Sequence, residues 1–205
     1  MMQIAKVIPL MVIGSLALVG CIGAEPEMDE GLGDEITEGD QDDGDVGEAE
    51  QELNAYCNDV INWDPAWASL ESQVLTLVNQ KRAAGATCGG TYYSPKPALT
   101  LDERLRCSSR KHSKNMGVNN FFSHTGSNGS QPWDRMTSAG YVWTYAAENI
   151  GAGYTTPASA VNGWMASPGH CQNIMSATAK HIGVGYYYAG SSTYKHYWTQ
   201  NFGKQ

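Results

Sequence analysis

Apolar residues recur at helical spacing in two long segments of the chain. From Pro65 to Lys81 the spacing predicts a core-facing helix whose stripe is Trp67, Leu70, Val74, Leu77 and Val78. A second helix is predicted from about Leu101 to Val118, with an inner face formed by Leu101, Leu105, Ser108, His112 and Met116. On such a face, His112 is more often a packed, hydrogen-bonded residue than a ligand, and both interpretations stay open.

Strict alternation near the C-terminus predicts a β-hairpin. Its two strands carry Ile182, Val184, Tyr186 and Tyr188, then His196, Trp198, Gln200 and Phe202, around a Gly190-Ser191-Ser192 turn. Between the long helices and this hairpin, residues 133–139 predict a short helix, and residues 141–154 predict an extended segment followed by a loop.

Two Ser/Thr-Pro pairs predict the starts of further helices. Thr156 can cap a helix that begins at Pro157, because a hydroxyl acceptor followed by proline is typical of a helix N-terminus. Ser167 and Pro168 repeat this pattern, and the short helix they predict contains His170. The hydroxyl of Ser167 is expected to be occupied as a cap.

The first 52 residues differ in composition from the rest. Residues 1–21 carry one cation, Lys6, and an apolar run of the length of a signal-peptide core, which predicts export. The run ends in Leu18-Val19-Gly20-Cys21, which resembles a bacterial lipobox and favours a lipid-anchored Cys21 over an ordinary signal peptide cut nearby. Residues 22–52 predict an acidic, disordered tether, and residues 53–205 a single folded domain.

The charge of the chain divides at the same point. Residues 22–52 hold 14 of the 21 acids and no Lys or Arg, so the domain keeps 7 acids against 12 Lys and Arg, about +5. The overall charge of −8 therefore describes the tether rather than the domain. Because the basic residues are scattered along the sequence, we expect no nucleic-acid partner.

Five cysteines divide into Cys21 and four in the domain. An even number in an exported domain predicts two disulfides, and three pairings of the four are open. We prefer Cys88–Cys107, which joins a loop to the next helix, and Cys57–Cys171, which ties the start of the domain to its body. The domain has no CxxC pair to suggest a cysteine metal site.

Three residues are candidates for chemistry. Glu148 stands in a stretch without Lys or Arg from Met136 to Ala179, and a carboxylate there is costly unless something specific pairs with it. His124, after two aromatics, and His170 could supply that pairing, with or without a metal ion between them.

These residues fall in an ordered set of motifs. Ser-His at 123–124, Glu-Asn-Ile at 148–150, Ser-Pro-Gly-His at 167–170, Ile-Gly-Val-Gly at 182–185 and the end from Trp198 to Gly203 resemble the CAP superfamily, which includes the cysteine-rich secretory proteins. The resemblance covers about residues 70–203 and is strongest to a short bacterial branch. It implies an α+β fold, a three-layer α-β-α sandwich with an open cleft.

The resemblance also implies a cleft of two His and two Glu that binds a divalent metal such as zinc. His124, Glu148 and His170 match three of these positions, whereas Ser167 occupies the place of the second Glu and Ala147 replaces a glycine. Two imidazoles and a carboxylate could hold zinc and leave a fourth position for water. However, the missing Glu removes the obvious general base.

Three functions follow as hypotheses. The first is a binding module whose cleft takes an extracellular lipid, peptide or glycan. The second is a metal-dependent hydrolase that uses His124, Glu148 and His170 as catalytic candidates. The third is a structural or defensive envelope protein with a vestigial cleft, in which the three residues form only a buried polar network. We rank binding first, because a fold alone does not give a reaction.

Overall fold

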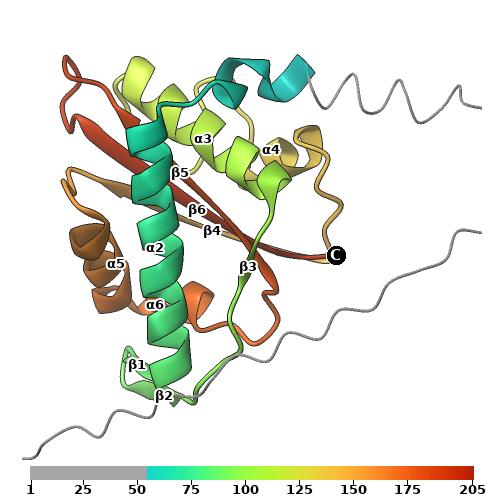
Figure 1. Cartoon of the computed structure of the whole chain (residues 1–205), viewed down its shortest axis with the longest axis vertical. Coiled ribbons are helices and arrows are strands. Elements are labelled where there is room, and N and C mark those ends of the chain that lie inside the picture. The colour runs from blue at the N-terminus through green and yellow to red at the C-terminus, as the bar shows by residue number, and fades with distance from the viewer. Residues whose placement is uncertain (1–54) are drawn as a thin grey trace, which may run out of the picture. The chain divides into compact units, whose positions relative to one another are not determined.

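The computed structural model describes residues 55–205 (Figure 1). The predicted signal peptide, the lipidated Cys21 and the predicted tether over residues 22–52 lie outside the described residues. Within residues 55–205, no helix has both the length and the apolar character needed to cross a membrane.

The first six labelled elements lie between residues 65 and 138. A helical segment over residues 55–61 precedes α2 (Pro65–Ala84), β1 (Ala86–Cys88), β2 (Thr91–Tyr93), β3 (Thr100–Leu101), α3 (Glu103–Val118) and α4 (Pro132–Ser138). The remaining elements are β4 (Tyr145–Ala152), α5 (Pro157–Ala166), α6 (Pro168–Ile174), β5 (His181–Tyr188) and β6 (His196–Lys204).

A four-stranded sheet with the order β3-β5-β6-β4 lies between two helical layers (Figure 1). The predicted hairpin is confirmed, since β5 and β6 pair antiparallel from His181 opposite Gly203 to Tyr188 opposite His196. β4 extends the sheet on the other side of β6, and β3 adds two residues parallel to β5. The α+β, three-layer prediction is therefore correct.

The main hydrophobic core lies between one face of this sheet and the helices α2, α5 and α6. Val74 and Val78 of α2 are fully buried against Trp164 of α5 and Ile182 of β5. The predicted apolar stripe of α2 is thus confirmed, and the helix begins after Asp64, whose carboxylate accepts a hydrogen bond from the Ala66 amide at 2.8 Å.

The opposite face of the sheet packs directly on the backbone of α3. A methyl group at Gly183 would meet the backbone of Leu105 and Arg106, and one at Gly185 would meet that of Ser109. The absence of side chains lets the Ser109 and Ser113 hydroxyls donate hydrogen bonds to the carbonyls of Gly183 (3.1 Å) and Gly185 (2.9 Å). The Ile-Gly-Val-Gly motif therefore sets the distance between α3 and the sheet.

The predicted start of the second long helix is wrong by two residues. Leu101 belongs to β3 and is 40% exposed, because Asp102 caps α3 by accepting hydrogen bonds from the amides of Arg104 (2.9 Å) and Leu105 (3.3 Å). The rest of the predicted inner face, Leu105, Ser108, His112 and Met116, is fully buried.

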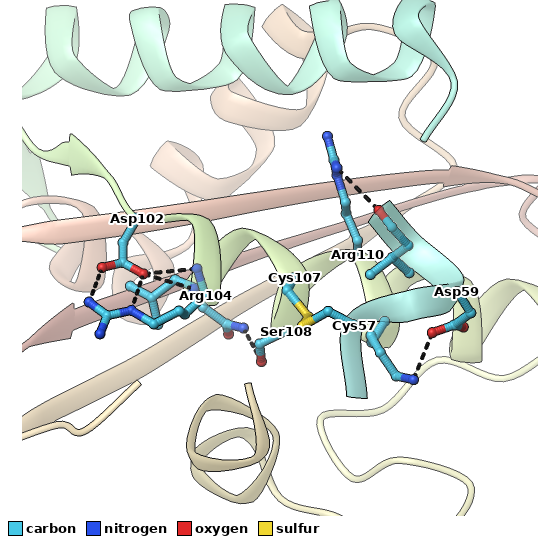
Figure 2. The surroundings of a disulfide bond; sticks show 11 residues. Cys57, Asp59, Asp102, Arg104, Cys107, Ser108 and Arg110 are labelled. Carbon is cyan, nitrogen blue, oxygen red and sulfur yellow. Dashed lines mark hydrogen bonds and ion pairs between the residues drawn. A yellow bond between two sulfur atoms is a disulfide. The ribbon is translucent and has the colours of Figure 1, made fainter. Parts of the chain in front are cut away.

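Two disulfides form, as predicted, but the preferred pairing is wrong. Cys57 is bonded to Cys107 and Cys88 to Cys171, rather than Cys88 to Cys107 and Cys57 to Cys171. The helical segment over residues 55–61 lies against α3, which brings Cys57 to Cys107 (Figure 2). The β1–β2 hairpin packs against α6 instead, so Cys88 meets Cys171. Nearness in sequence, which favours Cys88–Cys107, therefore does not decide the pairing; the packing of distant segments does.

Candidate functional site

The carboxylate of Glu148 is the centre of the candidate site. Glu148 lies on β4 with only 2% of its side chain exposed, and each of its oxygens has a partner. Oε1 is 2.8 Å from Nδ1 of His124, and Oε2 accepts a hydrogen bond from Arg135 at 2.8 Å. The expectation that something specific pairs with Glu148 is confirmed, although one partner is a guanidinium rather than a second imidazole.

Arg135 holds the wall of the site together. It lies on α4, with 5% of its side chain exposed, and donates hydrogen bonds to the carbonyls of Ser130 (2.8 Å) and His124 (2.9 Å) as well as to Glu148. The same guanidinium therefore fixes both the loop that carries His124 and the carboxylate that His124 contacts. A planar fork of donors suits such a junction better than an ammonium group would.

His124 is the accessible member of the site. It lies in the loop between α3 and α4, and 48% of its side chain is exposed. Its contact with Glu148 orients the ring in the way that a carboxylate orients a functional imidazole. His124 and Glu148 therefore form a histidine–carboxylate pair at the protein surface.

His112 lies behind this pair and is fully buried. Its Nε2 donates to the carbonyl of Ser123 at 2.9 Å, and the same atom is 3.9 Å from Oε1 of Glu148. Burial lowers the pKa of His112 to about 4, although the nearby Glu148 carboxylate acts in the opposite direction. His112 is therefore a neutral, packed histidine, as its place on the inner face of α3 predicts.

His170 lies on α6 and is half-buried. Burial lowers its pKa, and the neighbouring His124 lowers it further. Its backbone is tied to the sheet, because the Asn149 side chain donates to the His170 carbonyl at 3.1 Å. Among the described residues, no hydrogen bond joins the His170 ring to Glu148 or to His124.

Ser167 is the N-cap residue of α6 by position, but not by hydrogen bonding. Within residues 55–205 its side chain accepts no capping hydrogen bond, so the expectation that the hydroxyl is occupied is wrong. Pro168 at the first position of α6 lacks an amide proton, which leaves one fewer donor to satisfy at this helix start.

A small cavity of about 270 Å³ opens beside Glu148. Its walls come from the loop after α3, from α4 and from β4, and the lining residues are His124, Gln131, Pro132, Trp133, Ala146, Ala147 and Glu148. The indole of Trp133 is 48% exposed, so the cavity offers one aromatic wall beside several polar groups. Such a combination is typical of a small-molecule binding site.

The arrangement does not fit a divalent metal ion as it stands. Both oxygens of Glu148 are engaged, and one of them contacts the positive charge of Arg135. In the part of the chain that the structure describes, no three His, Cys, Asp or Glu side chains are grouped to hold a metal ion. Zinc binding by His124, Glu148 and His170, which the resemblance implies, would require Glu148 to leave Arg135.

Comparison with known families decides the membership of the chain. The family model described as the cysteine-rich secretory protein family, CAP, matches residues 75–202. The chain belongs to the CAP family.

Two curated relatives of this CAP domain come from Bacillus subtilis. The uncharacterized protein YkwD is 37% identical over 135 residues, which is 66% of this chain and 47% of YkwD. The uncharacterized membrane protein YlbC is 28% identical over 143 residues, covering 70% of this chain and 37% of YlbC. The CAP chain therefore spans less than half the length of the curated relatives that it matches.

Solved structures show the same fold. An extracellular SCP-domain protein from Bacillus anthracis superposes with a TM-score of 0.57 at 28% identity, over 67% of this chain and 41% of that protein. An outer surface protein from Borrelia burgdorferi has a TM-score of 0.52 at 19% identity, over 67% of this chain and 91% of that protein.

Two residues of the CAP site were not among the predicted site residues. Arg135 is the last cation before the stretch without Lys or Arg that contains Glu148. No local pattern predicts that its side chain, on α4, would reach Glu148 on β4. For His112 the sequence left both a packed residue and a ligand open, and its Nε2 lies 3.9 Å from Oε1 of Glu148. The one signal in the sequence is that Arg135 is the cation nearest to Glu148 along the chain.

Proposed function

We propose that this CAP domain is an exported binding module whose cavity beside Glu148 takes a glycan. One observation carries the proposal: Glu148 is held by Arg135 and His124 through both of its oxygens. A carboxylate fixed in this way is a rigid hydrogen-bond acceptor and a poor mobile base. Binding uses such a group directly, whereas general-base catalysis needs it free.

The aromatic wall of the cavity supports a sugar as the ligand class. A sugar ring has an apolar face of C–H groups and a rim of hydroxyl groups. The exposed indole of Trp133 suits the face, and Gln131 and the Glu148–His124 pair suit the rim. A lipid chain would cover the half-exposed ring of His124 without offering it a hydrogen-bond partner, which is costly.

Tetra-N-acetylchitotetraose is a suitable soluble probe, followed by tryptophan fluorescence and calorimetry on the full chain. We expect Trp133→Ala to weaken binding by at least about tenfold, which corresponds to about 1.4 kcal/mol. Trp143→Ala is the matched control, because Trp143 is similarly exposed (40%) and does not line the cavity. No binding, or equal losses in both variants, would contradict the proposal.

A hydrolase is the second candidate, because His124 and Glu148 form a surface histidine–carboxylate pair. Mass spectrometry of the chitotetraose mixture, and ester and peptide substrates with and without chelator, test for turnover. Cleavage that is lost in His124→Ala would replace the binding proposal by an enzymatic one. Unchanged substrates after long incubation support binding alone.

We propose that the protein lies on the outside of the cell envelope and is anchored there through a lipidated Cys21. The signal-peptide pattern of residues 1–21 supports export, and the similar Bacillus anthracis protein is described as extracellular. Mass spectrometry of the mature N-terminus tests the anchor. A mature chain that begins elsewhere, or with an unmodified Cys21, would contradict it.

A further inference from the structure

A second cavity, of about 340 Å³, is lined in part by Arg135, the residue that also binds Glu148. The helical segment over residues 55–61, the helix α3 and the loop before α4 form its walls. The lining residues that matter here are Tyr56, Asp59, Lys111, Lys114, Val118 and Arg135. Arg135 is the residue that this cavity shares with the carboxylate site.

The walls of this second cavity carry two lysines and one carboxylate, besides Arg135, whose charge is already paired with Glu148. Lys111 and Lys114 are one helical turn apart on α3, and both ammonium groups contact Asp59, at 2.8 and 2.9 Å. Although burial alone would raise it, these two ammonium groups hold the pKa of the Asp59 carboxyl below its usual value. One carboxylate therefore serves two lysines, and a positive excess is left in the cavity.

Several donors of the cavity remain available to a ligand. Lys111 uses one of its three ammonium protons, on Asp59, and lies over the ring of Tyr56 at 4.6 Å from its centre. The Nε–H of Arg135 is buried and has no hydrogen-bond partner within the described residues. This atom has no accessible surface, so Arg135 adds to the wall of the cavity and not to the donors that a ligand can reach.

We infer that this second cavity binds a phosphate group carried by a small polyol. Donors come from α3 and from the loop before α4, so they approach the ligand from more than one side. A tetrahedral phosphate can accept from all of these sides, whereas a planar carboxylate presents only two oxygens. The side chains of Tyr56 and Val118 give the carbon part an apolar contact. The inference does not rest on the proposed glycan function.

The phosphate group can belong either to a free organic phosphate or to a lipid head group. Separate probes distinguish these two sources. Calorimetry on the full chain at low salt uses glycerol 3-phosphate, and co-sedimentation uses vesicles of phosphatidylglycerol, with phosphatidylcholine vesicles as the blank. We expect binding of glycerol 3-phosphate that weakens by at least about tenfold in the double variant Lys111→Gln/Lys114→Gln. Vesicle capture with the same dependence assigns the lipid source, and its absence assigns the free one.

Two further variants make the test specific. Asp59→Asn removes the competing carboxylate and should tighten glycerol 3-phosphate binding several-fold. Lys180→Gln makes the same charge change at an exposed position outside the cavity and should leave binding unchanged. Circular dichroism checks that each variant is folded, as expected for exposed ion pairs that contribute little stability. Absence of binding, or an equal loss in Lys180→Gln, overturns the inference.

Discussion

The guanidinium of Arg135 lies 2.8 Å from the carboxylate of Glu148, and neither side chain is more than 5% exposed. A buried ion pair of this kind is most sensitive to the loss of one partner, because the other charge is then left in a medium of low polarity. Substitution of one member of this pair should therefore lower the stability of the domain more than substitution of an exposed residue of the site.

Replacing Arg135 by Met should lower the free energy of unfolding by about 3–5 kcal/mol, because Glu148 would stay buried without a cationic partner and keep only its contact with His124. Urea unfolding measures this loss. The double variant Arg135→Met/Glu148→Leu should recover part of the stability, since it removes both charges. His124→Ala should cost about 1 kcal/mol or less, because its side chain is half exposed. A smaller loss in Arg135→Met than in His124→Ala would contradict the pair's role.

His112 should make the stability of the domain depend on pH. Its pKa is about 4 in the folded state and 6.5 in the reference state, so the unfolded chain binds its proton first as the pH falls. The contribution is therefore fully present above about pH 6.5 and is lost between pH 6.5 and about 4. It amounts to about 3–4 kcal/mol at most, at about 1.4 kcal/mol per pKa unit.

The comparison that isolates this effect is unfolding of the parent chain and of His112→Gln at pH 7, 5.5 and 4.5. A glutamine amide can still donate to the Ser123 carbonyl but does not titrate. The stability difference between the two proteins should shrink or reverse as the pH falls. Parallel curves would show that His112 titrates alike in both states.

Gly183 should be intolerant of even one methyl group. The backbone of α3 at Leu105 and Arg106 occupies the space that a side chain would need, so Gly183→Ala must separate α3 from the sheet. We expect a loss of about 2–3 kcal/mol or more by thermal unfolding. Gly169→Ala is the matched control: it faces open space within α6 and should be neutral or stabilising by up to about 1 kcal/mol. Equal effects would exclude the close approach as the cause.

Local patterns predicted most of the fold correctly. The stripe of α2, the alternation of β5 and β6 and the cap at Thr156 depend on neighbours within a few residues, and each is present. The ordered motifs also brought His124 and Glu148 together correctly.

What the sequence missed depends on contacts between distant segments. The placement of the helical segment over residues 55–61 on α3 decided the partner of Cys57, and no local pattern reports such packing. The same holds for the basic residues. They look scattered along the sequence, but folding brings Lys111, Lys114 and Arg135 to one cavity. The start of α3 was predicted wrongly for a local reason. The apolar spacing favours Leu101 as a helical residue, but the side-chain cap of Asp102 makes Glu103 the first residue of the helix.

Zinc should not bind tightly to the parent chain through the predicted ligands, because Arg135 already neutralises Glu148. Calorimetry with zinc on the full chain, compared with His124→Ala and His170→Ala, measures this. We expect the three titrations to agree. A one-to-one site in the parent chain that is lost in both variants would restore the predicted metal centre and require Glu148 to leave Arg135.

The two disulfides should have separable effects on the second cavity. Cys57–Cys107 holds the helical segment over residues 55–61 against α3 (Figure 2). This segment supplies Tyr56 and Asp59 to the cavity. Cys57→Ser/Cys107→Ser should therefore weaken glycerol 3-phosphate binding, with a loss of stability of about 2–5 kcal/mol.

Cys88–Cys171 is the control bond, because it joins β1 to α6 and neither element lines the cavity. Cys88→Ser/Cys171→Ser should lower stability by a similar amount and leave glycerol 3-phosphate binding unchanged wherever the domain stays folded. Non-reducing peptide mapping of the parent chain should yield peptides joined through Cys57–Cys107 and Cys88–Cys171. Equal binding losses in the two double variants would mean that general stability, rather than the position of residues 55–61, governs the cavity.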